Sequence, residues 1–228
     1  MLKHVAEAHL SGTVLIATPG TPNFEFLCSG FLCSNKGYIL TCAHALDLTK
    51  KIYIALPPPS DSFPPIQGGT FNFAQATVAQ FDPINDVALL KVDPMAFTAN
   101  GPAPSAAMGD ERNIPIGTTV GYFGFPFGAR SLILLKTSQS IISAKVTNER
   151  GARSLVLDSS VNDGNSGGPL IDSRTNKIIG IISGRYSPSG NHPVAWIGGV
   201  ALGQDSNISF ATGISYAVDL LKAEGIYE

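Results

Sequence analysis

Short apolar runs separated by turn residues fill most of this chain and limit what it can fold into. In the first half they cover residues 13–17, 24–33, 38–42, 51–56, 71–81 and 86–92. In the second half they cover residues 118–123, 132–137, 140–147, 154–157, 169–172 and 177–183. This spacing, in a chain with 24 glycines and 16 prolines, predicts antiparallel barrels or sandwiches and not alternating strand–helix units.

The pattern leaves little room for helices. Only residues 216–224 repeat apolar side chains with helical periodicity, so we expect an all-β chain with one C-terminal helix and a weakly structured N-terminus. The proline-rich residues 57–69 predict a surface loop, and residues 93–109, rich in Pro, Ala, Gly and Ser, predict a linker between two halves. The turn sequence of residues 34–37 predicts a hairpin between two of the runs.

Charge and hydropathy narrow the range of partners. With 15 Lys and Arg against 17 Asp and Glu, the net charge of −2 gives no electrostatic reason to expect nucleic acid or an anionic membrane. No apolar run approaches the ~18 residues that a membrane span needs. The first residues, interrupted by His4, Glu7 and His9, do not resemble a signal peptide, which favours an intracellular location.

Three cysteines, Cys28, Cys33 and Cys42, lie close together in the sequence. An odd count in a chain of 228 residues does not resemble a secreted disulfide framework, and this also favours an intracellular location. Cys42 and His44 could complete a metal site with the other two cysteines, but the spacing matches no common zinc pattern. We therefore expect small buried side chains here, with no metal and no cofactor.

The stretch around Ser166 has the strongest chemical character. Gly164, Asn165, Gly167 and Gly168 surround the serine, so its hydroxyl can stand on a tight turn whose amides point into one concavity. A serine hydroxyl is a poor nucleophile unless a base takes its proton and a third group orients that base.

The chain offers one well-placed base and one well-placed carboxylate. Of four histidines, only His44 follows a buried strand directly, although a histidine there can equally be a core residue. Asp86 opens a buried strand, where it needs a partner or else serves as a turn cap after Asn85. The order His44, Asp86, Ser166 is one of the chain orders found in Ser-His-Asp hydrolases.

These motifs resemble those of a known family. TCAHAL, NDVALLKV and GNSGGP resemble the histidine, aspartate and serine motifs of trypsin-like serine proteases. GFLCSNKGYILTCAHAL, GTTVGYFGFPFG, IISAKV, SSVNDGNSGGPLID, KIIGIIS and ISFATGISYAVDLL resemble segments of the HtrA/Deg branch in order, from about residue 11 to residue 221.

The resemblance implies a chymotrypsin-type fold of two antiparallel six-stranded barrels. One would span about residues 11–100, the other about 112–212, with a helix at about 215–224. Many HtrA/Deg proteins continue into a PDZ domain, whereas this sequence ends after the expected helix, so it is either a piece of a longer protein or a protease domain without PDZ. The branch's tendency to form trimers implies a homo-oligomer.

The resemblance also implies roles for single residues. Ser166 would attack a peptide bond, His44 would act as base, and Asp86 would orient His44. The amides of the turn Gly164, Asn165, Ser166 would form an oxyanion hole. Asn165 replaces the aspartate that pairs with a newly cleaved N-terminus in secreted trypsin-like enzymes, so other contacts must order this turn.

The implied substrates are polypeptides. The pocket for the side chain at the cleaved bond would be formed by Ser160, Val161, Ile182, Ser183, Gly184 and Arg185. Ser160 carries no charge, which favours small or medium apolar side chains, although Arg185 could favour an acidic one and Asp163 could offset it. A substrate would pair as an added strand with residues 181–184.

Two other interpretations stay open. An α/β-hydrolase would place its histidine after the serine, where this chain has only His192, and would need many more helices. A catalytically silent or latent protease fold would bind peptides without cutting them, or would cut only after a partner orders the Gly164 turn.

Overall fold

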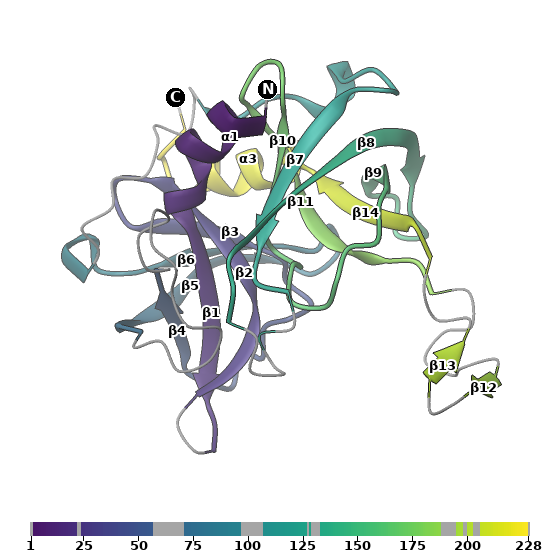
Figure 1. Ribbon diagram of the computed structural model, residues 1–228. Helices are drawn as coiled ribbons and strands as arrows, with labels where there is room; N and C mark the ends of the chain where they lie inside the picture. The colour runs from purple at the N-terminus through teal and green to yellow at the C-terminus, as the bar shows by residue number, and fades with distance from the viewer. Residues whose placement is uncertain are drawn as a thin grey trace.

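The computed structural model of this chain describes residues 2–21, 24–56, 71–96, 107–126, 128, 133–187, 195–197, 200–202 and 206–227 (Figure 1). The predicted proline-rich loop, residues 57–69, lies outside these ranges, as does most of the predicted linker.

The described chain forms two closed antiparallel barrels of six strands each (Figure 1). The first has the order β1-β2-β3-β6-β5-β4, with strands β1 (Thr13–Pro19), β2 (Phe24–Ser34), β3 (Tyr38–Thr41), β4 (Ile52–Ala55), β5 (Phe73–Asp82) and β6 (Val87–Lys91). The second has the order β10-β11-β14-β9-β8-β7, with strands β7 (Thr119–Gly124), β8 (Lys136–Thr147), β9 (Arg153–Asp158), β10 (Pro169–Asp172), β11 (Ile178–Arg185) and β14 (Ile208–Gly213). The predicted all-β double barrel is confirmed.

The other elements are short. Two helices, α1 (Leu2–His9) and α3 (Ile214–Ala223), pack beside the barrels, and β12 (Ala195–Ile197) and β13 (Val200–Leu202) form a separate two-stranded antiparallel sheet. Single 3-10 turns, η1 to η3, cover Leu10–Gly12, Pro94–Ala96 and Glu111–Asn113. No helix among the described residues is long and apolar enough to cross a membrane.

Each barrel is filled by its own apolar side chains, and a further cluster joins the two. The core of the first barrel includes Ile16 and Leu90, and the core of the second barrel includes Leu157 and Ile179. The joining cluster takes Leu40 from the first barrel, Phe123 from the second and Leu221 from α3, all fully buried. Burial of this cluster fixes one barrel against the other, and so fixes the loops that meet between them.

Helix α3 confirms the predicted C-terminal helix, and a distant glutamate caps it. Its N-cap, Gly213, has no side chain, and the buried carboxylate of Glu111 accepts instead from the Ser215 amide at 3.1 Å and hydroxyl at 2.7 Å. Arg153 Nε donates to the same carboxylate at 2.9 Å, so its charge is paired. The helix N-terminus is thereby held on the second barrel.

Two expectations about local structure are wrong, and the apolar runs missed one strand. The N-terminus is not weakly structured: it forms α1, whose Val5 is fully buried between the barrels. Residues 132–137 and 140–147 are not two strands, because Lys136–Thr147 is one strand with a register shift between Ile142 and Ala144. The sixth strand of the second barrel is β14, a segment that the apolar runs do not mark.

Candidate active site

His44 and Asp86 meet at the open end of the first barrel. His44 lies just after β3, in a turn closed by a hydrogen bond from the Leu46 amide to the Ala43 carbonyl at 3.1 Å. Asp86 ends the connection between β5 and β6. Since β3 and β6 are paired neighbours, this topology brings the end of one strand beside the start of the other.

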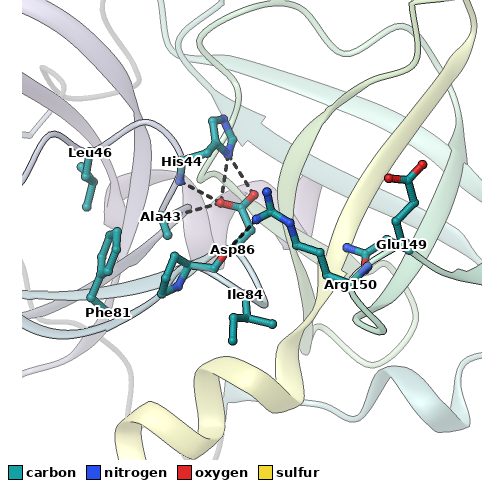
Figure 2. Close-up of a pocket in the computed structure, with 10 residues that line it drawn as sticks. Ala43, His44, Leu46, Phe81, Ile84, Asp86, Glu149 and Arg150 are labelled. Atoms are coloured by element: carbon teal, nitrogen blue, oxygen red, sulfur yellow. Dashed lines mark hydrogen bonds and ion pairs between the residues drawn. The ribbon is translucent and has the colours of Figure 1, made fainter.

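The Asp86 carboxylate holds the imidazole through both oxygens (Figure 2). His44 Nδ1 lies 3.0 Å from Oδ1 and 2.8 Å from Oδ2. Oδ1 also accepts from the backbone amides of Ala43 at 3.0 Å and His44 at 2.8 Å. The His44 side chain is 50% exposed, so it is not a core histidine, and its Nε2 edge is directed away from the carboxylate.

The Asp86 backbone is strained. Its φ of 57° lies in the left-handed region, which a non-glycine residue adopts at a cost of order 1–3 kcal/mol. The preceding turn is capped by Asp82, which accepts from the amides of Ile84 at 3.1 Å and Asn85 at 3.0 Å. Asp86 is therefore not the turn cap, and its contacts with the His44 segment hold it in the strained conformation.

The carboxylate changes the acidity of His44. Hydrogen bonding to Asp86, followed by contact of Nε2 with Cys42 Sγ at 3.9 Å, raises the pKa of His44 from 6.5 to about 10, against an opposing effect of burial. Contact with Cys28 and burial raise the pKa of the Cys42 thiol well above its usual range, so the sulfur beside the imidazole is uncharged at neutral pH.

Ser166 stands on the glycine-rich turn between β9 and β10 of the second barrel. Gly164 has a φ of 95° and Gly167 a φ of 85°, both in the region that favours glycine. At Gly167 a Cβ atom would collide with the Ser29 carbonyl oxygen and with Thr41 Oγ1. This turn therefore packs tightly on β2 and on β3, just before His44.

The amides of Gly164 and Ser166 donate to no other group in the part of the chain that the structure describes. Three other amides of the turn are engaged: Asn165 N donates to Asn162 O at 3.1 Å, Gly167 N to Ile182 O at 2.7 Å and Gly168 N to Asn165 O at 3.0 Å. Two amides two residues apart are thus available to bind an anion or oxyanion.

The serine hydroxyl does not face the histidine. Ser166 Oγ donates to the Ser183 carbonyl on β11 at 3.1 Å, and no hydrogen bond joins Ser166 to His44 among the described residues. The structure therefore brings His44 and Asp86 into direct contact. It places Ser166 on a turn that packs against β2 and β3, and the Ser166 hydroxyl donates to the Ser183 carbonyl and not to His44.

The predicted pocket residues lie on two segments beside this turn. Val161 is buried, and its amide donates to Ser209 Oγ at 3.0 Å, while Ser160 is half-buried. Ile182 is buried and bonded to both Gly167 and Gly168. The other members, Ser183, Gly184 and Arg185, are half-buried near the end of β11.

A cavity of about 610 Å³ lies on the aspartate side of this site (Figure 2). The first barrel contributes His44, Asp86 and apolar side chains, and the second contributes the turn Asn148–Arg150. Arg150 Nη1 donates to the Pro83 carbonyl at 3.0 Å, which ties that turn to the segment carrying Asp86.

The three cysteines are buried and form no disulfide bond, as expected for small core side chains. Among the described residues no group of three or more His, Cys, Asp or Glu side chains is arranged to hold a metal ion.

Comparisons with known proteins identify the family. A family model described as the trypsin-like peptidase domain matches residues 28–181. The chain belongs to this family.

Curated relatives agree with the family assignment, and a solved structure agrees with the fold. A Pseudomonas putida protein named "Probable periplasmic serine endoprotease DegP-like" is 30% identical over 207 residues, which are 88% of this chain and 36% of that protein. The magnetosome formation protease MamE of Paramagnetospirillum magneticum is 29% identical over 188 residues, 80% of this chain and 23% of that protein. The chain thus spans about a third or less of the length of these relatives. A structure titled "HtrA-type protease AlgW with tripeptide" is 23% identical, covers 98% of this chain and 63% of its own, and has a TM-score of 0.71.

Sequence reasoning missed two contacts in this trypsin-like peptidase domain. Arg150 lies in a short polar turn that carries no motif, and nothing in its sequence context marks it. Ser29 lies inside an apolar run, where its bonds to the serine turn, Ser29 Oγ to Gly164 O at 2.7 Å and Ser29 N to Ser166 O at 2.9 Å, depend on how the barrels pack. A polar residue in a buried strand is the only signal that the sequence offers.

Proposed function

We propose that this trypsin-like domain is a serine endopeptidase in which Ser166 is the nucleophile, His44 the general base and Asp86 the group that orients His44. The observation that carries the proposal is the contact of both Asp86 oxygens with His44 Nδ1. This contact keeps the proton on Nδ1 and leaves Nε2 of the neutral imidazole as an acceptor.

The reaction begins when the Ser166 hydroxyl turns from the Ser183 carbonyl toward His44. Ser166 Oγ attacks the substrate carbonyl while His44 Nε2 takes its proton, and the negative oxygen that forms is bound by the Gly164 and Ser166 amides. His44 then gives the proton to the leaving amine, which departs from an acyl-enzyme. A water molecule, deprotonated by the same imidazole, releases the acid and regenerates Ser166.

For specificity, we propose cleavage after small or medium apolar residues. Support comes from the uncharged Ser160 and the buried Val161 and Ile182, which offer no carboxylate for a basic side chain. The substrate backbone pairs with residues 183–184 at the end of β11, which adds affinity without reading sequence. The predicted pairing with residues 181–182 does not hold, because the Ile182 amide and carbonyl are bonded to Gly168 and Gly167 and Ile181 is paired within the barrel. A peptide library distinguishes this preference from an acidic one directed by Arg185.

A fluorophosphonate probe tests the hydrolytic proposal, because it reacts only with an activated serine. We expect covalent labelling of the folded protein, with the adduct mapped to Ser166 by mass spectrometry. Labelling that requires an added peptide marks a latent protease. A folded protein that stays unlabelled with and without peptide contradicts the proposal and leaves a peptide-binding module with a protease fold.

The pH dependence of hydrolysis should be shifted to the alkaline side. The general base must be neutral, and hydrogen bonding to Asp86 together with the Cys42 contact raises the pKa of His44 from 6.5 to about 10, so kcat/KM should rise with pH to a midpoint above 6.5. Cys42→Ala removes a second contact that raises this pKa and should move the midpoint down. The measurement is kcat/KM for an uncharged peptide between pH 5 and 10.

The control for this profile is Cys33→Ala, because Cys33 is equally buried but its Sγ contacts the Tyr38 carbonyl and not His44. It should leave the midpoint in place. A flat wild-type profile between pH 5 and 8 contradicts the role of His44 as base.

A further inference from the structure

A single serine of the first barrel holds the turn that carries the candidate nucleophile. Ser29, on β2, is fully buried. Its hydroxyl donates to the Gly164 carbonyl at 2.7 Å, and its amide donates to the Ser166 carbonyl at 2.9 Å. One residue thus binds both ends of the segment 164–166 from across the boundary between the barrels.

The hydroxyl has a fixed direction. Ser29 Oγ accepts from the Phe125 amide, just after β7, at 2.9 Å, so its own hydrogen is left for Gly164. It therefore joins three segments: β2, the end of β7 and the serine turn. Because the site is fully buried, water cannot replace a lost bond without a structural change.

The two hydrogen bonds from Ser29 leave a specific set of backbone groups unpaired in segment 164–166. All three carbonyls of segment 164–166 are paired: Gly164 and Ser166 with Ser29, and Asn165 with the Gly168 amide. The Asn165 amide is paired with Asn162. Within segment 164–166, the Gly164 and Ser166 amides have no acceptor among the described residues, and they are the two that the proposed oxyanion hole uses.

We propose that Ser29 is a positioning residue that orders the oxyanion-binding turn from the first barrel. The inference rests on the proposed function. Asn165 stands where secreted trypsin-like enzymes carry an ion-pairing aspartate, so other contacts must order this turn. Two uncharged hydrogen bonds from Ser29 do so, by holding the Gly164 and Ser166 carbonyls away from the cleft. No cleavage of the chain is needed to create this anchor.

Ser29→Ala tests the proposal, because it removes the hydroxyl and keeps the amide bond to Ser166. A misplaced oxyanion hole acts on the transition state, so kcat should fall about 10- to 100-fold while KM changes by less than about threefold. Affinity for a peptidyl trifluoromethyl ketone, whose hemiketal oxygen occupies the hole, should fall by a similar factor. Affinity for a C-terminally amidated product peptide, which carries no carboxylate, should stay unchanged.

Two further variants separate positioning from general stability. Thr18→Val removes another fully buried hydroxyl of the first barrel, which donates to the Lys51 carbonyl at 2.9 Å. It should lower Tm by about 2–4 °C and leave kcat unchanged. Ser29→Cys replaces the hydroxyl by a somewhat larger thiol that is a weaker donor. It should give an intermediate kcat, and it is compared with Thr18→Val if Ser29→Ala does not fold.

The outcomes of these experiments test the role of Ser29 separately from the proposed endopeptidase activity. An active wild type with a folded Ser29→Ala or Ser29→Cys variant of equal kcat overturns the role of Ser29 alone. The role of Ser29 is also overturned if Thr18→Val, at the same loss of Tm as the Ser29 variant, shows the same loss of kcat. A wild type that neither hydrolyses peptides nor reacts with a fluorophosphonate overturns both.

Discussion

Ser166→Ala is expected to lower kcat by about 10⁶ and to leave the fold intact, because removal of the nucleophile stops the reaction at its first step. The backbone bonds of the turn do not need the hydroxyl: the Ser166 carbonyl still accepts from the Ser29 amide, and Gly167 still donates to Ile182. The substitution removes the hydrogen bond from the hydroxyl to the Ser183 carbonyl, which should lower the free energy of unfolding by about 0.5–1.5 kcal/mol. Turnover of a fluorogenic peptide and the Tm measure the two effects.

Ser143→Ala is the matched control. Ser143 Oγ makes the same kind of bond to a strand carbonyl, that of Val156 at 3.2 Å, on the second barrel away from the serine turn. It should keep wild-type kcat. Hydrolysis by Ser166→Ala at the wild-type rate, in a preparation free of other proteases, would remove Ser166 from the mechanism.

The candidate site could be chosen from the sequence because its chemistry lies in short local motifs. His44 directly follows an apolar strand, Asp86 directly precedes one, and Ser166 is surrounded by glycines. Close packing explains the glycines: a side chain at Gly167 would enter the space of Ser29 and Thr41. The hairpin at residues 34–37 is equally local, and the amide of Gly37, at a φ of 80°, bonds to Ser34 there.

Features that depend on tertiary packing lie beyond sequence reasoning. Helix α1 has eight residues and buries only Val5, too little to produce a periodic pattern. Strand β14 has six residues, mixes apolar side chains with Ser209, Thr212 and Gly213, and lies in a stretch that continues into α3, so no apolar run marks it. The direction of the Ser166 hydroxyl and the bonds of Ser29 depend on how the two barrels meet, which no local pattern encodes.

Asp86→Asn is expected to lower kcat by about 10⁴ with little change in KM. The two backbone amides of Ala43 and His44 both point at Oδ1, so the asparagine should place its carbonyl oxygen there. Its NH₂ group then faces His44 Nδ1 and can only donate to it. The imidazole must therefore carry its proton on Nε2, where it cannot accept the proton of Ser166.

Asp47→Asn controls for the loss of a carboxylate close to His44. Asp47 accepts from the Thr49 amide at 3.0 Å and hydroxyl at 2.6 Å and has no contact with His44, so this variant should keep wild-type kcat. Asp86→Asn should also react slowly with a fluorophosphonate, because the base is blocked and the nucleophile is still present. An Asp86→Asn enzyme with wild-type kcat at neutral pH would show that the carboxylate acts only on the strained turn and not on the tautomer of His44.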